Sequence, residues 1–127
     1  MNKKILIVDD EPHIRALIAQ TLEELEDEGV EILTANNGAD ALEIIKNEKP
    51  DLVYLDVMMP RMNGFEVCTE VKKNLKMTEV HIVMLTAKGQ EFDKQKGLEM
   101  GADIYTTKPF DPDWILEYAA ERLGIEV

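Results

Sequence analysis

The chain has 127 residues, the size of a single domain, and its 45% hydrophobic and 31% charged residues are typical of a globular fold and exclude a low-complexity chain. Acidic residues outnumber basic ones by 26 to 14, and the formal net charge of −12 disfavours direct contact with nucleic acid or an anionic membrane. No apolar run reaches about 18 residues, the length of a membrane span, and the single cysteine, Cys68, cannot form an intramolecular disulfide. We therefore expect a cytoplasmic protein without membrane contact, in which Cys68 is a small buried side chain.

Five segments along the chain predict strands. Residues 5–8, 52–55 and 82–85 are continuous apolar runs, which are typical of strands buried on both faces of a sheet. Residues 30–35 and 103–106 mix polar with apolar side chains, as edge strands do. We expect three central strands flanked by two edge strands.

Each predicted strand is followed by a segment with helical spacing. Residues 39–47 predict a short second helix, and residues 90–100 a weaker fourth helix with few large apolar side chains. The apolar stripes expected to face the sheet are Ile14, Leu17, Ile18, Leu22 and Leu25 in the first helix, Cys68, Val71 and Leu75 in the third, and Ile115, Tyr118, Ala119 and Leu123 in the last. Predicted strands and helices alternate strictly and are joined by short connections, which predicts an α/β fold of five βα units. We expect helices on both faces of a parallel sheet and a core at about residues 3–124.

Chemically reactive residues follow the predicted strands at their carboxyl ends. Asp9 and Asp10 follow the first strand, Asp56 the third, Thr86 the fourth and Lys108 the fifth. The carboxyl ends of parallel strands lie at one edge of the sheet, where such folds bind their ligands. We therefore expect three carboxylates, one hydroxyl and one ammonium group to converge there.

The three carboxylates predict a site for a hard divalent cation. Three such charges would repel one another strongly without a cation between them, and an all-oxygen set of ligands suits Mg²⁺. Asp9, Asp10 and Glu11 could alternatively stabilise the start of the following helix through its dipole. Thr86 could likewise be an ordinary strand-terminal threonine, and Lys108 a solvated surface charge.

Four motifs in this order resemble the receiver domains of two-component response regulators. They are Val-Asp-Asp-Glu-Pro at 8–12, Asp-Val-Met-Met-Pro-Arg-Met-Asn-Gly-Phe-Glu at 56–66, Leu-Thr-Ala at 85–87, and Gly-Ala-Asp at 101–103 followed by Lys-Pro-Phe at 108–110. The resemblance covers nearly the whole chain. It implies one receiver domain over residues 1–127 with a doubly wound, flavodoxin-like (βα)5 fold and strand order 2-1-3-4-5.

The resemblance also implies the role of each site residue. Asp56 would accept a phosphoryl group from the phosphohistidine of a sensor histidine kinase or a histidine phosphotransfer protein, as a switch rather than a turnover enzyme. Mg²⁺ would be held by Asp10, Asp56 and the backbone carbonyl of Met58, with Asp9 reaching it directly or through water. The remaining contacts to the phosphoryl group would come from Lys108, Thr86 and the backbone amide of Ala87.

By the same resemblance, the switch would run from Thr86 to Tyr105. Phosphorylation would draw Thr86 towards Asp56, and Tyr105 would turn into the vacated space. The face formed by the fourth helix, fifth strand and fifth helix would then change shape for a downstream protein or an effector domain. Ile104 and Tyr118 depart from the charged pattern of dimerising DNA-binding regulators, so we expect a monomer or weak dimer.

We consider three alternative functions: a phosphatase, a nucleotide-binding protein and an interaction module. Haloacid dehalogenase-type phosphatases also form an aspartyl phosphate, but they need Asp-x-Asp after the first strand, where this chain has Asp9-Asp10. A glycine-rich nucleotide-binding loop is absent after the first predicted strand. An interaction module that keeps the fold without phosphorylation is the third reading.

Overall fold

Parallel strands form a central sheet in the computed structural model, which describes residues 3–86, 99, 101–107 and 111–126. Within these residues the sheet has five strands in the order β2-β1-β3-β4-β5, which confirms the predicted fold class and strand order. The strands are β1 (Lys4–Val8), β2 (Glu31–Ala35), β3 (Leu52–Asp56), β4 (His81–Thr86) and β5 (Ile104–Thr107). The predicted helix at 90–100 lies largely outside the described residues, as do Ala87, Lys108 and Pro109.

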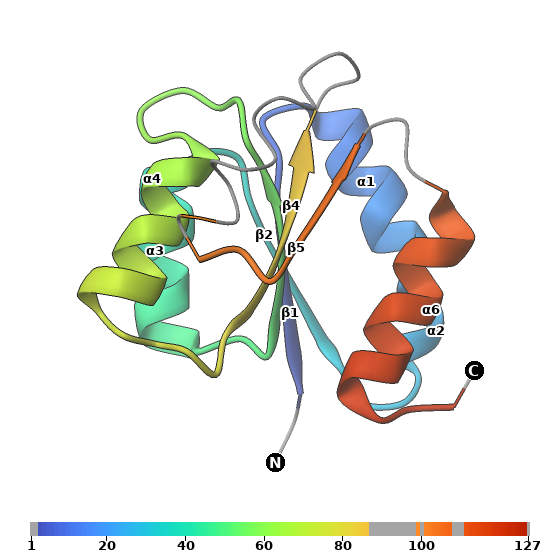
Figure 1. Ribbon diagram of the computed structural model, residues 1–127. Helices are drawn as coiled ribbons and strands as arrows, with labels where there is room; N and C mark the ends of the chain where they lie inside the picture. Colours follow the sequence, from blue (N-terminus) through green and yellow to red (C-terminus); the bar gives the residue numbers. More distant parts are fainter. Residues whose placement is uncertain (1–2, 87–98, 100, 108–110, 127) are drawn as a thin grey trace.

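Helices cover both faces of the sheet in three layers (Figure 1). One face packs against α1 (Pro12–Thr21), α2 (Glu23–Glu26) and α6 (Pro112–Leu123). The other packs against α3 (Gly38–Glu48), α4 (Gly64–Thr69) and the π-helical turn η1 (Glu70–Asn74). Each face has its own apolar core because successive side chains of a strand point to opposite faces.

Cys68 lies fully buried in the core between the sheet and α4, as the sequence predicted. Burial raises the pKa of its thiol to about 12. The thiol therefore remains protonated near neutral pH and packs as a small apolar group.

Two leucines of the predicted apolar stripes are not in the core. Leu17 is 41% exposed, because residues one apart on a helix are rotated by about 100° and Leu17 lies at the margin of the stripe centred on Ile18. Leu75 is 39% exposed, because the Leu75 amide bonds to the carbonyl of Glu70 at 2.8 Å and this wider π turn rotates it off the stripe. The first predicted helix is also divided, since Leu22 leaves helical geometry between α1 and α2.

Asparagine side chains set the start of two helices. The Asn37 side chain accepts a hydrogen bond from the Asp40 amide at 2.9 Å and caps α3. Asn63 accepts one from the Glu66 amide at 2.9 Å, and the Glu66 carboxylate accepts one from the Asn63 amide at 3.1 Å. This reciprocal capping box fixes the start of α4.

A buried hydrogen bond joins the central strand β3 to helix α6. The Tyr54 hydroxyl donates to the carbonyl of Ile115 at 2.7 Å, and Tyr54 itself is fully buried. Burial raises the pKa of Tyr54, so the hydroxyl stays a donor across the accessible pH range. The contact ties the strand that ends at Asp56 to the helical layer on that side.

Candidate functional site

The carboxyl ends of β1 and β3 bring three aspartates together. β1 and β3 pair directly, with Val8 beside Leu55, so Asp9 and Asp56 follow at the same end of neighbouring strands. Asp9, Asp10 and Asp56 each offer a carboxylate oxygen, and these oxygens all lie within 4.8 Å of one another. The site lies where the order of the sheet reverses around β1, which is the expected ligand position in this class of fold.

The three carboxylates differ in exposure. Asp9 is fully buried and Asp56 is 5% exposed, whereas Asp10 faces solvent. Grouping buried negative charges is unfavourable unless cations or hydrogen-bond donors compensate them. Oxygen ligands at this separation, one of them open to solvent, fit Mg²⁺, which retains several waters when it binds to proteins.

The loop from β1 to α1 is held through Asp9. The Asp9 amide donates to the carbonyl of Ala35 at 3.2 Å, and Asp9 Oδ1 accepts from the amide of Glu11 at 2.9 Å. The Asp9 carbonyl accepts a hydrogen bond from Arg15 Nη1 at 2.7 Å. Arg15 was not singled out in the sequence, although its place one turn into the helix after the aspartates could have suggested it.

The loop from β3 to α4 closes tightly below Asp56. The Val57 amide donates to the carbonyl of Leu85 at 3.0 Å, and the Gly64 amide donates to the carbonyl of Val57 at 2.8 Å. A Cβ atom on Gly64 would lie 2.4 Å from the carbonyl oxygen of Asp56, so only glycine fits. Met58, whose carbonyl the family resemblance assigns to the metal, lies in this loop and is 60% exposed.

The predicted switch residues lie on two neighbouring strands. Thr86 ends β4 and is fully buried, and Tyr105 of β5 packs against the core on the α3 and α4 side. Thr86 pairs with Thr107 and Met84 with Tyr105, so Thr86 and Tyr105 share one face of the sheet. Lys108 directly follows β5 and Ala87 directly follows β4 in sequence, but both lie outside the described residues.

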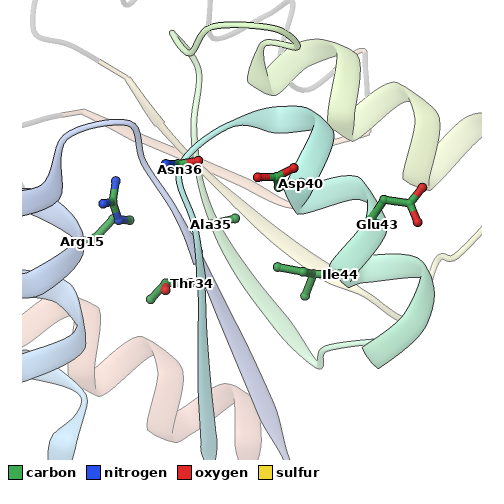
Figure 2. Close-up of a pocket in the computed structure, with 7 residues that line it drawn as sticks. All are labelled: Arg15, Thr34, Ala35, Asn36, Asp40, Glu43 and Ile44. Atoms are coloured by element: carbon green, nitrogen blue, oxygen red, sulfur yellow. The ribbon is translucent and has the colours of Figure 1, made fainter.

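An open pocket of about 460 Å³ lies at the edge strand β2, between Arg15 of α1 and helix α3. Figure 2 shows Arg15 on one side of β2 and α3 on the other, with Asn36 at the end of the strand. Asp40 of α3 lines the pocket and also pairs with Arg61 of the β3–α4 loop at 3.5 Å. Arg15 thus lines the pocket and also bonds to the loop that carries Asp9.

A polar cluster that the sequence did not predict lies at the start of β4. His81, to which the sequence assigned no role, is hydrogen-bonded through Nε2 to the Tyr118 hydroxyl, and its Nδ1 lies 3.7 Å from Asp103 Oδ2. Lys72 Nζ contacts the same carboxylate oxygen at 2.8 Å, and Trp114 stacks on Tyr118 with ring centroids 4.9 Å apart. The rings of Trp114 and Tyr118 are therefore half-buried and are joined through His81 to a charged cluster.

Comparison with known proteins decides the family. The sequence matches the response regulator receiver domain model over residues 5–120. This chain belongs to the response regulator receiver domain family. Receiver domains are signalling modules of two-component systems rather than turnover enzymes.

Curated relatives of this receiver domain are longer proteins. The alkaline phosphatase synthesis transcriptional regulatory protein PhoP of Bacillus subtilis is 51% identical over 112 residues, which cover 88% of this chain and 45% of that protein. The probable transcriptional regulator ycf27 of Porphyra purpurea is 48% identical over 110 residues, covering 87% of this chain and 43% of that protein. The chain thus spans less than half the length of these relatives. The expectation of no nucleic-acid contact concerns these residues alone and stays a prediction.

Solved receiver domains share the same fold. The BeF3-activated DrrB receiver domain superposes with a TM-score of 0.83 at 33% identity, covering 98% of this chain and 99% of that one. The chemotaxis response regulator CheY4 of Vibrio cholerae gives a TM-score of 0.81 at 34% identity, covering 96% and 99% of the two chains. The described part of the chain contains no helix with the length and hydrophobicity that a membrane-spanning segment requires.

Proposed function

We propose that this receiver domain is a phosphorylation-dependent switch that accepts a phosphoryl group on Asp56. The donor is the phosphohistidine of a sensor histidine kinase or a histidine phosphotransfer protein. The observation that carries the proposal is the convergence of Asp9, Asp10 and Asp56 within 4.8 Å at the carboxyl ends of two central strands. This arrangement supplies both a nucleophile and a place for the cation that phosphoryl transfer requires.

The transfer step follows from the placement of Asp56. An oxygen of its carboxylate forms the new bond to phosphorus while the bond from phosphorus to the donor imidazole nitrogen breaks and the imidazole leaves. A carboxylate is a weak nucleophile towards phosphorus, so most of the catalysis is positioning and charge compensation. The bonds of Val57 to β4 and of Gly64 to Val57 hold the backbone on which Asp56 is presented.

Mg²⁺ fits this donor set, with Asp10, Asp56 and the Met58 carbonyl as ligands and Asp9 as a direct or water-mediated one. When bound, the ion compensates negative charge on the transferring phosphoryl group. Asp9 is buried with its carboxylate hydrogen-bonded to the Glu11 amide, so it contributes fixed charge rather than a mobile ligand. Exposed Asp10 is the carboxylate that can adjust to the ion and its waters.

The remaining phosphoryl contacts come from Thr86, Lys108 and the backbone amide of Ala87. A phosphoryl group adds roughly one and a half to two negative charges near neutral pH, enough to draw a neighbouring hydroxyl into a new hydrogen bond. Thr86 then moves towards Asp56, and Tyr105 on the same face of the sheet follows it. Such a relay shifts the balance between two conformations that already exist.

The output is transmitted through β5, α6 and the segment at 90–100 for which the sequence predicts a helix. Ile104 and Tyr118 give this face no charged pair for dimerisation, and Trp114 stacked on Tyr118 offers an aromatic contact. The partner is a downstream protein or an effector domain, and the domain acts in the cytoplasm as a monomer or weak dimer.

Phosphorylation by a small-molecule donor tests the proposal. The purified domain is incubated with acetyl phosphate or phosphoramidate and Mg²⁺, and its intact mass is measured. We expect a gain of one phosphoryl group, no gain with Asp56→Asn or after chelation of Mg²⁺, and an unchanged gain with Asp27→Asn, an exposed carboxylate on the C-cap of α2. A domain that gains no phosphoryl group, or one that gains it without Asp56, would contradict the proposal.

A further inference from the structure

The start of α1 lacks a capping hydrogen bond from its N-cap side chain. Its N-cap residue, Glu11, makes no side-chain capping hydrogen bond and instead pairs with His13 Nε2 at 3.2 Å on the surface. The loop that carries Asp9 and Asp10 therefore lacks the anchor that an N-cap side chain usually provides. Half-buried Arg15 reaches back from α1 and donates from Nη1 to the Asp9 carbonyl at 2.7 Å.

The bond to Arg15 lies at the position where the loop leaves the sheet. The Asp9 amide is bonded to Ala35 of β2, and the Asp9 carboxylate is bonded to the Glu11 amide. The Asp9 carbonyl belongs to the peptide group that leads into Asp10, so its orientation sets the direction in which Asp10 leaves the strand. A charged donor at 2.7 Å is among the stronger hydrogen bonds available in a protein.

We infer that Arg15 is a positioning residue: it fixes the Asp9–Asp10 peptide and thereby holds both carboxylates in the geometry that binds Mg²⁺. The inference rests on the proposed function, because it concerns the same metal site. Groups that orient metal ligands without touching the metal commonly change its affinity by about 10- to 100-fold when they are removed.

The direction in which the Mg²⁺ affinity changes when Arg15 is replaced distinguishes a positioning role from a purely electrostatic one. Arg15 carries a positive charge close to a cation site, so by charge alone its removal would strengthen Mg²⁺ binding. A positioning role predicts the opposite, since the carboxylates would lose their arrangement. Arg15→Met removes the charge and the donor, whereas Arg15→Lys keeps the charge and loses the planar guanidinium.

Calorimetric titration of the metal-free domain with MgCl2 tests the inference. We expect Arg15→Met to bind Mg²⁺ about tenfold more weakly than the parent, and Arg15→Lys to lie between them. Arg122→Met is the matched control, because it removes one positive charge from the last turn of α6, and it should bind Mg²⁺ as the parent does. Asp10→Asn should abolish the heat of binding and so identifies the acidic site as its source.

Each outcome is decisive. Equal or tighter Mg²⁺ binding by a folded Arg15→Met variant overturns the inference and leaves the proposed function in place. A parent that binds no Mg²⁺ overturns both. If circular dichroism shows that Arg15→Met does not fold, Arg15→Lys decides: weaker binding supports positioning because the charge is unchanged, and binding equal to the parent overturns it.

Discussion

Gly64 lies against the backbone of Asp56, the proposed phosphoryl acceptor. Because a Cβ atom there would lie 2.4 Å from the carbonyl oxygen of Asp56, Gly64→Ala must displace the backbone that carries this residue. We expect a loss of about 1–3 kcal/mol in the free energy of unfolding, typical of overpacking, together with slower phosphorylation by acetyl phosphate. Urea unfolding and the time course of the intact mass measure the two effects.

Gly29 supplies the control for this variant. It has a φ of 91° but nothing within 4 Å of its Cβ position, so Gly29→Ala strains the backbone far from Asp56 without a steric clash. Such strain costs on the order of 1–3 kcal/mol. We expect Gly29→Ala to lower stability while the phosphorylation rate stays at the parent value. Equal slowing by both variants would show that the rate follows stability rather than the local geometry.

His81 makes stability depend on pH. Burial, opposed by Asp103 and assisted by Arg122 and Lys72, lowers the pKa of His81 from its ordinary 6.5. The folded state therefore favours the neutral ring, which contributes stability that is present above the unfolded pKa and is lost as pH falls through the folded one. We expect the free energy of unfolding to fall as the pH is lowered below about 6.5, the ordinary pKa of histidine.

The variant His81→Gln isolates this contribution. It keeps a polar group near Tyr118 but cannot take up a proton, so its loss of stability over the same pH range should be smaller than that of the parent. Carboxylates titrate in both proteins and cancel in the comparison. Identical pH dependence in the two proteins would exclude His81 as its source.

At the residue scale, the sequence predicted those residues whose position depends only on where the strands end. Asp9, Asp10 and Asp56 come together because they lie at or just after the carboxyl ends of two neighbouring parallel strands. It did not identify Arg15 or His81, since their roles depend on where side chains reach. The hydrogen bond from His81 to Tyr118 spans 37 positions and needs the helix-to-strand packing to be known first.

At the scale of elements, the capping box of α4 carries a measurable share of stability. Asn63 and Glu66 each bond the other's amide, so removing either leaves one amide of the first turn without its partner. We expect Asn63→Ala to lower the free energy of unfolding by about 1 kcal/mol and Glu66→Ala by less. Chemical denaturation of both variants measures these values.

The double variant tests whether the two residues act as one unit. Because the capping box is reciprocal, Asn63→Ala with Glu66→Ala should lose less stability than the two single losses added together. The matched pair is Glu43→Ala with Lys46→Ala on α3, whose exposed side chains lie 3.9 Å apart and should add nearly independently. Strict additivity at 63 and 66 would show that the two bonds form independently.

The sequence predicted the strands and helices well where their hydrophobic pattern is regular. The three central strands begin and end within one residue of the predicted runs, because continuous apolar runs are unambiguous in a sheet covered on both faces. The π turn at 70–74 was missed, because a helix pattern in sequence assumes a constant 3.6 residues per turn. The break at Leu22 was missed because its apolar side chain continues the stripe across the interruption.

For the whole molecule, the excess of acidic residues predicts stabilisation by salt. With a formal charge of −12, repulsion between surface carboxylates opposes the compact state, although pairs such as Lys4 with Glu48 at 2.7 Å act in the other direction. Raising NaCl from low ionic strength to about 0.15 M shortens the screening distance to about 8 Å. We expect the melting temperature of the metal-free domain to rise.

Scanning calorimetry in the presence of a chelator measures this effect without divalent ions. Replacing Glu23, Glu24 and Glu26 of α2 by glutamine reduces the negative charge at one end of the molecule. The salt dependence of this variant should be smaller than that of the parent. A melting temperature that falls with salt would mean that surface ion pairs outweigh the net repulsion.

The hydrogen bond from Tyr54 to Ile115 sets a mechanical limit on α6. Sliding this helix along the sheet would break a fully buried bond of 2.7 Å, while turning the helix about that point leaves the bond in place. Ile115 is thus a pivot near one end of α6, and Leu123 at the other end is about 12 Å away along the axis. A small tilt of the helix about Ile115 would therefore displace the end that carries Leu123 the most.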